Sequence, residues 1–388
     1  MSAFARTLMM DFARGTGLSP AGSNPRRYLW TDAFAVCNFL GFFERDGAKR
    51  FLDLALSLVN QVHRTLGRNR PDDPRRGWIS GLGEGEGARH PTAGGLRIGK
   101  PLPERRHGEP ADERLEWEQD GQYYHYLTKW MHALERAGRV AGDPDLLRWA
   151  IELAKTAHAG FTYAPRASGP KRLYWKVSID LSYPLVASMG QHDPLDGFVT
   201  YHELQAAART FPGTSFPGLE DEIGDMRAIL RSTMGNLATD DPLGIGGLLV
   251  DARRMTELAT GGGFDFGEVV EAVLGSALAG LESWARGFSP AEPALYRLAF
   301  RELGLSIGLA ALADLRKGLL QKPGRAGAAA GGSPGTIEAL VKYLPLRGSI
   351  EKFWTNGRNR ESAAWLEHGD INTVMLATSL DPDGFLAV

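Results

Sequence analysis

Apolar residues along the chain recur at spacings of three and four over long stretches, and the alternation typical of strands is scarce. Such spacing places apolar side chains on one face of an α-helix. The pattern therefore indicates an all-α protein. Helices are predicted over 2–14, 30–44, 47–66, 118–138, 144–159, 178–191, 194–209, 219–237, 242–260, 265–287, 294–320, 335–345 and 370–380.

These predicted helices form pairs whose two members differ. The first member is apolar nearly all round and rich in small residues, as in GIGGLLV (244–250) and GLSIGLAAL (304–312), whereas the second has a polar face, as in Arg148, Glu152 and Lys155. A helix that is apolar on every side is buried on every side, and one with a polar face lies at the surface. We therefore expect about six hairpins in two concentric layers, with irregular repeats that favour a closed ring over a solenoid.

Two segments interrupt the helical pattern. Residues 67–116 form a long connection rich in Gly, Pro, Arg and Glu. Connections of this length inside a compact domain are usually functional or disordered, and we expect this one to lie over the mouth of a helical barrel. Residues 322–335 (KPGRAGAAAGGSPG) have the composition of a flexible linker between helices. Both interruptions fit within a single domain over 1–388.

Composition and charge narrow the classes of function. The 44 basic and 46 acidic residues nearly balance, which gives no electrostatic support for a nucleic-acid partner. Apolar runs stay below the ~18 residues that span a bilayer, and the N-terminus does not resemble a signal peptide. The single cysteine, Cys37, excludes an internal disulfide and a multi-cysteine zinc site. We expect a cytoplasmic protein without a membrane partner, a metal ion or another cofactor, and its oligomeric state is open.

Three segments carry a resemblance to a known superfamily: YLWTDAFAVCNFLGF (28–42), DGQYYHYLTKWMHALERAG (120–138) and WLEHGDINTVMLATSL (365–380). Together with the helical hairpins, they make the chain resemble the six-hairpin glycosidase-like superfamily of (α/α)6 toroids. That group includes glycoside hydrolases, polysaccharide lyases and sugar isomerases of the N-acylglucosamine 2-epimerase type. The resemblance implies an all-α toroid whose ligand site lies where the inner helices begin and long loops gather.

Carboxylates stand at or near the starts of the predicted inner helices, namely Asp32, Asp120, Asp180, Asp241 and Asp370. Helix capping accounts for any one of them, because a carboxylate there satisfies free N–H groups. Convergence at one rim is the functional alternative, since glycoside hydrolysis needs one protonated and one ionised carboxyl group. Asp120 and Asp180 are the preferred catalytic pair, because aromatic and polar residues surround each of them in the sequence.

Further residues are predicted to contact a ligand. His125 can exchange a proton near neutral pH, although a hydrogen-bonded core histidine is the alternative. Arg97 and Lys100 of the long loop are expected to reach an anionic group or to form local salt bridges. Aromatic faces with polar neighbours suit the apolar face of a sugar. The remaining predicted contacts are Trp30, Asp32, Tyr124, Trp175, Trp365, His368, Asp370 and Asn372.

Two formal motifs have simpler explanations. Gly94, Gly99 and Lys100 match the spacing of a phosphate-binding P-loop, but Pro101 replaces the hydroxyl residue that holds magnesium. The DExxD pattern of Asp221, Glu222 and Asp225 resembles that of terpene synthases, yet it also describes one polar helix face.

The leading hypothesis is a carbohydrate-active enzyme, most strongly a glycoside hydrolase with paired carboxylates at the barrel mouth. One alternative is a sugar epimerase or isomerase that uses His125 and His368 as an acid/base pair. Another is a non-catalytic toroid that binds a saccharide or a protein. For the enzymes, the partner is a small-molecule or oligosaccharide substrate, whose sugar and linkage the sequence leaves open.

Overall fold

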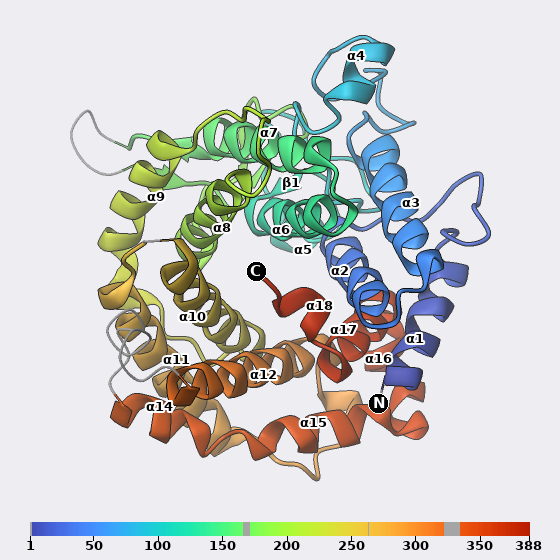
Figure 1. Ribbon diagram of the computed structural model, residues 1–388. Coiled ribbons are helices and arrows are strands. Elements are labelled where there is room, and N and C mark those ends of the chain that lie inside the picture. Colours follow the sequence, from blue (N-terminus) through green and yellow to red (C-terminus); the bar gives the residue numbers. More distant parts are fainter. Residues whose placement is uncertain (1, 166–170, 263, 322–333) are drawn as a thin grey trace. The chain divides into compact units, whose positions relative to one another are not determined.

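The computed structural model describes residues 2–165, 171–262, 264–321 and 334–388, most of them helical (Figure 1). The predicted linker at 322–335 lies almost entirely outside the described residues. The helices are α1 (Ser2–Gly15), α2 (Leu29–Asp46), α3 (Lys49–Leu66), α4 (Glu84–Arg89), α5 (Glu113–Glu116), α6 (Tyr124–Ala141), α7 (Pro144–Phe161), α8 (Asp193–Ala208), α9 (Glu220–Thr233), α10 (Pro242–Gly262), α11 (Gly267–Gly287), α12 (Ala299–Gln321), α14 (Pro334–Val341), α15 (Pro345–Thr355), α16 (Ala363–Glu367), α17 (Gly369–Leu380) and α18 (Asp383–Leu386). Within these ranges, no helix is long and apolar enough to cross a membrane.

The chain divides into two compact units. Unit 1 contains the first residues up to Phe12 together with Thr233–Val388, and unit 2 contains Ala13–Ser232. Each unit has its own buried helices, which amphipathic helices cover.

In unit 2, α6 lies between α2 and α8, and α3 and α7 lie against these helices (Figure 1). Helices α2 and α8 are buried along most of their length, whereas α3 and α9 are buried on one face. The DExxD residues belong to α9, and two of the three form ion pairs with α7. Glu222 accepts a hydrogen bond from Lys155 at 2.9 Å, and Asp225 lies 3.0 Å from His158. This motif therefore joins two helices.

Local sequence signals set the ends of these helices. At the start of α2, the backbone N–H of Tyr28 donates to the Asp32 carboxylate at 2.9 Å, which satisfies a free group of the first turn. Gly47 ends α2 and Gly142 ends α6, each with a φ of 66°. Glycine adopts this left-handed conformation without the steric cost of a Cβ atom. The capping explanation of Asp32 thus describes one of its contacts; Asp32 also pairs with Arg27 at 3.4 Å.

The predicted helix at 178–191 is wrong. This region instead holds β4 (Lys176–Val177), a turn and β5 (Pro184–Val186), which pair antiparallel with each other; β4 also pairs with β1 (Gln122–Tyr123). Pro184 cannot donate the backbone hydrogen bond that a helix interior needs, and strand pairing satisfies its neighbours instead. A second small sheet joins β2 (Thr162–Tyr163) to β3 (Arg172–Leu173).

In unit 1, α10 contacts both α11 and α12, and α12 also contacts α15 and α17. The small residues noted in the sequence lie where α10 meets α12. A Cβ atom on Gly246 would stand 2.1 Å from the carbonyl oxygen of Gly304, and one on Gly308 would stand 2.5 Å from Cα of Gly246. Glycine therefore permits the close approach of these two backbones. The helix predicted at 335–345 corresponds to α14, and α15 follows it as a separate helix that was not predicted.

Candidate functional site

The long loop of unit 2 is held by Asp120, which is completely buried four residues before α6 begins. Its carboxylate pairs with Arg97 at 2.6 Å and with Arg70 at 3.2 Å. It also accepts backbone hydrogen bonds from Gly99 at 3.0 Å and from Gly121 at 3.1 Å. The segment with P-loop spacing thus contacts a carboxylate of the chain itself. Through these contacts Asp120 anchors the loop.

Asp180 lies in the turn between β4 and β5, where its side chain is 40% exposed. It accepts hydrogen bonds from the Ser178 hydroxyl at 2.8 Å and from the Ser182 backbone at 3.1 Å, and Arg75 pairs with it at 2.7 Å. Partial burial acts to raise the pKa of Asp180, but the bonds from Ser182 and Ser178 outweigh it and lower the pKa. Asp120 and Asp180 therefore pair with different arginines.

A continuous group of aromatic side chains lies where α2 and α6 begin. The hydroxyls of Tyr28 and Tyr126 are 2.6 Å apart, and the Tyr123 ring lies 5.1 Å from that of Tyr126 and 5.2 Å from that of Trp175. Trp175 in turn contacts Trp117, whose residue is 53% exposed. We call this set the aromatic group; its members are Tyr28, Trp30, Trp117, Tyr123, Tyr126 and Trp175.

His125 connects the aromatic group to two carboxylates on α8. Its ring stacks on Trp175 with an interplanar angle of 12° at 6.2 Å, and its Nδ1 atom lies 3.7 Å from Oδ1 of Asp193. Asp196, one turn further along α8, pairs with Lys129 at 2.7 Å. We call the set His125, Thr128, Lys129, Asp193 and Asp196 the α6–α8 site.

Burial shifts the pKa values of Asp193 and His125 in opposite directions. Desolvation, followed by the charge of Asp196, raises the pKa of Asp193 to about 8, and desolvation lowers the pKa of His125 to about 4. Asp196 has the opposite environment, because Lys129 and the Thr128 hydroxyl, which donates at 2.5 Å, stabilise its charge. Two neighbouring carboxyls with such different surroundings are typical of an acid paired with an ionised group.

Two buried atoms of this site are unsatisfied. Among the described residues, neither Oδ2 of Asp193 nor Nδ1 of His125 has a hydrogen-bond partner. Buried polar atoms are normally paired, so such atoms point to a ligand or to a catalytic role. The α6–α8 site therefore offers a neutral carboxyl group and a neutral imidazole at neutral pH.

Sequence reasoning missed Asp193 and Asp196. Assigning a helix to 178–191 made 194–209 its outer partner and directed attention to Asp180. The predicted helix at 194–209 begins one residue after α8 does, so its start was found. Its burial along most of its length, which encloses these two carboxylates, was not predicted.

Of the other residues predicted in unit 2, Trp30 belongs to the aromatic group and Lys100 contacts it, whereas Tyr124 contacts the interior. Trp30 is 7% exposed and its ring lies 6.4 Å from that of Tyr126. The ammonium group of Lys100 lies 5.4 Å from the centre of the Tyr28 ring. Tyr124 is fully buried and donates to the Tyr201 hydroxyl at 2.9 Å, so it contacts the interior.

The predicted C-terminal contacts lie in unit 1, around α16 and the start of α17. The His368 ring contacts Phe300 at 5.4 Å, and Trp365 contacts Trp354 at 5.5 Å. Asn372 is completely buried and donates to the Trp365 carbonyl at 2.9 Å. Asp370 lies in the first turn of α17. These residues are grouped together, in a unit other than that of His125.

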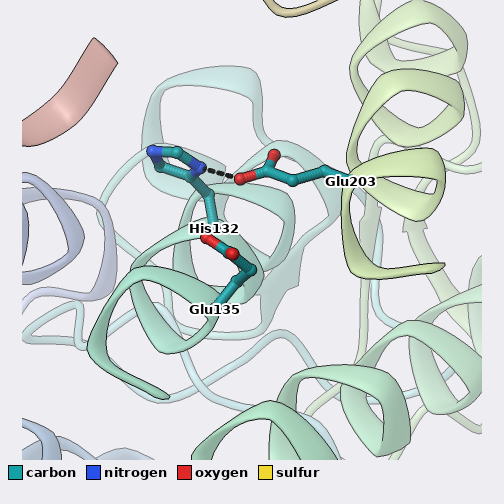
Figure 2. A group of neighbouring side chains, drawn as sticks. All are labelled: His132, Glu135 and Glu203. Carbon is teal, nitrogen blue, oxygen red and sulfur yellow. Dashed lines mark hydrogen bonds and ion pairs between the residues drawn. The ribbon is translucent and has the colours of Figure 1, made fainter. Parts of the chain in front are cut away.

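Within the described part of the chain, one group of side chains has the spacing of metal ligands: His132 and Glu135 on α6 with Glu203 on α8 (Figure 2). Each has a protein contact. His132 Nδ1 lies 2.6 Å from Glu203, and Arg139 pairs with Glu135 at 2.8 Å. Burial and then the charge of Glu203 raise the pKa of Glu135. A cation here would have to compete with the guanidinium group of Arg139.

Comparisons with known proteins support the fold. No family model matches the chain. No curated protein matches it in sequence either. A solved GH76 alpha-mannanase of Bacteroides thetaiotaomicron aligns over 99% of this chain and 97% of its own, with a TM-score of 0.56 and 10% identity. A sugar epimerase from a ruminal bacterium aligns over 91% and 87%, with a TM-score of 0.47 and 11% identity.

The prediction of an all-α, (α/α)6 toroid fold is confirmed. The resemblance to six-hairpin glycosidase-like proteins thus holds at the level of fold. At this identity, the likeness does not extend to the reaction.

Proposed function

We propose that this protein is a carbohydrate-active enzyme whose chemistry takes place at the α6–α8 site. The observation that carries the proposal is the buried Asp193 carboxyl, whose Oδ2 atom has no hydrogen-bond partner among the described residues, beside Asp196, which pairs with Lys129 at 2.7 Å. Burial and the charge of Asp196 raise the pKa of Asp193 to about 8. The aromatic group continues from His125, and aromatic faces bind the apolar side of a pyranose ring. A fold shared with an alpha-mannanase adds support for a saccharide substrate.

Glycoside hydrolysis is the reaction that fits these protonation states best. Asp193 holds its proton at neutral pH and donates it to the oxygen of the leaving group. Asp196 stays ionised and stabilises the positive charge that develops on the sugar ring. A water molecule then bonds to the ring carbon and gives a proton to the Asp193 carboxylate, which restores the acid. We assign Asp120 a positioning role, because its bonds to Arg70 and Arg97 hold the long loop beside α6. Asp180 has a similar role through Arg75.

Sugar epimerisation is the second candidate, and a specific observation favours it. The buried Nδ1 atom of His125 has no hydrogen-bond partner among the described residues, so a neutral imidazole is available to accept a proton from a sugar carbon. In that reaction His125 is the base and Asp193 returns the proton.

The test is a screen of the whole protein against aryl glycosides and oligosaccharides, beginning with alpha-mannosides. Release of a reducing end indicates hydrolysis, and a change of configuration seen by NMR indicates epimerisation. Asp193→Asn should lower kcat by roughly 10²–10⁴-fold, the usual contribution of a positioned acid. Asp221→Asn, an exposed carboxylate on α9, is the matched control and should retain full activity.

The outcomes separate the candidates. Full activity in folded Asp193→Asn excludes Asp193 as the acid. Hydrolysis that survives His125→Ala assigns His125 a supporting role, whereas epimerisation lost in His125→Ala supports the second candidate. An absence of turnover across the panel contradicts an enzymatic function and favours the non-catalytic toroid.

A further inference from the structure

A cavity of about 400 Å³ opens in unit 1, where α10 and α12 begin and α11 ends. Pockets that bind small molecules have volumes of roughly 300–1,000 Å³. All of its lining residues belong to unit 1, so it contains no residue of the α6–α8 site, which belongs to unit 2. We call it the α10–α12 pocket.

Aromatic rings form one side of the α10–α12 pocket. The rings of Trp284 and Phe288, at the end of α11, stack with their centres 4.5 Å apart. Tyr296, which precedes α12, also lines the pocket and is 72% exposed. Large aromatic residues that are half-buried or exposed around a cavity offer flat apolar surfaces to a ligand.

A rigid polar group also lines the pocket. Arg297 is 4% exposed, and its guanidinium group donates to the Glu302 carboxylate at 2.8 and 2.6 Å. Trp354 donates to the same carboxylate at 2.8 Å, and the Phe353 ring lies 3.7 Å from the guanidinium carbon. The Nη1 group of Arg297 makes no hydrogen bond with the described residues. The pair with Glu302 therefore holds the guanidinium group in place, and the N–H donors of Nη1 remain available to a ligand.

The charges of the pocket select the kind of ligand. Its lining contains the carboxylates of Asp240, Glu292 and Glu302 against the guanidinium groups of Arg297 and Arg301. Glu302 neutralises Arg297, and Asp241 lies 3.3 Å from Arg301. An anionic ligand would meet an excess of negative charge. A neutral molecule with many hydroxyls would instead find both donors and acceptors next to apolar rings.

We propose that the α10–α12 pocket binds a neutral saccharide, with a pyranose ring against the aromatic side and its hydroxyls on Arg297 and Arg301. This site requires no chemistry at Asp193, so it stands independently of the proposed function.

The experiment uses the full chain labelled with 5-fluorotryptophan. The ¹⁹F resonance of Trp284 is assigned by its loss in Trp284→Phe, and it reports on this pocket alone. Uncharged mono- and disaccharides of glucose, galactose, mannose and N-acetylglucosamine are titrated, with glucuronate as the charged probe. The Trp284 resonance should shift saturably with a neutral sugar and respond more weakly to glucuronate.

Matched variants complete the test. Tyr296→Ala should weaken binding roughly tenfold, because it removes one aromatic face from an exposed position without disturbing the core. Leu366→Ala, equally exposed in unit 1 and outside the pocket, should leave the titration unchanged. Asp193→Asn should also leave it unchanged, which distinguishes this site from the α6–α8 site.

Three results would overturn the proposal. The first is a Trp284 resonance that stays unshifted across the whole panel at millimolar sugar. The second is binding of the same strength in folded Tyr296→Ala. The third is tighter binding of glucuronate than of the neutral sugars.

Discussion

The Nδ1 atom of His125 and the Oδ1 atom of Asp193 face each other at 3.7 Å, beyond hydrogen-bond distance. A buried ion pair between them would have raised the pKa of the imidazole and lowered that of the carboxyl. Burial instead shifts the two pKa values in the opposite directions, to about 4 for His125 and about 8 for Asp193. Both side chains are therefore neutral between these values, because neither gains enough from the other to offset desolvation.

The pH at which kcat/KM falls on the alkaline side should depend on the charges around Asp193. Activity that needs its proton declines as the pH rises through about 8. Asp196→Asn removes a negative charge that raises the pKa of Asp193, so the fall should move to lower pH. Lys129→Met removes a positive charge that lowers this pKa, so the fall should move to higher pH. The measurement is kcat/KM against pH, and shifts in the same direction would contradict the assignment.

Asp193 should also make stability depend on pH. Its pKa is near 3.9 in an unfolded chain and about 8 in the folded protein, so only the folded state holds the proton between these values. The stability that this proton contributes is fully present below about pH 4 and is lost as the pH rises to about 8.

Asp193→Asn cannot ionise and should escape this loss. The variant should therefore gain in free energy of unfolding over the wild type as the pH rises from about 5 to about 8. Urea denaturation at both ends of this range measures the gain. If the difference in free energy of unfolding between the variant and the wild type did not change with pH, the pKa of Asp193 in the folded protein would be its ordinary value.

Asp120 and Asp180 should differ sharply in their effect on stability. Asp120→Asn leaves the buried Arg97 without a countercharge, whereas Arg70 keeps its pair with Asp72 at 2.8 Å, and breaking a buried pair costs about 3–5 kcal/mol. Asp180→Asn should cost about 1 kcal/mol or less, because its pair with Arg75 is partly exposed. Chemical denaturation of both variants tests this. Equal losses would contradict the anchoring role of Asp120.

The contact between α10 and α12 can be tested with adjacent glycines. Gly246→Ala places a Cβ atom against the backbone of Gly304, and the helices can relieve this only by moving apart. Overpacking of this kind costs about 1–3 kcal/mol. Gly247→Ala is the control, because no atom lies within 4 Å of its Cβ position and alanine favours the helix. Thermal unfolding should show a lower Tm for the first variant and an unchanged or higher Tm for the second.

The sequence by itself determined the helical class of this protein and the position of most helices. The spacing of apolar residues located α2, α3, α7, α10, α11 and α17 because helical periodicity is a local property. The small, apolar segments of α10 and α12 likewise predicted buried helices, whereas the close approach of their backbones was seen only in the structure. Local periodicity failed at 178–191, where β5 pairs with β4, the strand that in turn pairs with β1, more than fifty residues earlier.

Only the tertiary structure decided which carboxylates are candidates for chemistry. Asp120 looked available in the sequence, but Arg70 and Arg97, which lie 50 and 23 residues away, occupy its oxygens. Asp193 and Asp196 share one helix three residues apart, yet Lys129 and Thr128 on α6 stabilise the charge of Asp196, while burial keeps Asp193 protonated. The free energy of ionisation depends on burial and on neighbouring charges. Both depend on residues that are distant in the sequence and that only folding places around the carboxyl group.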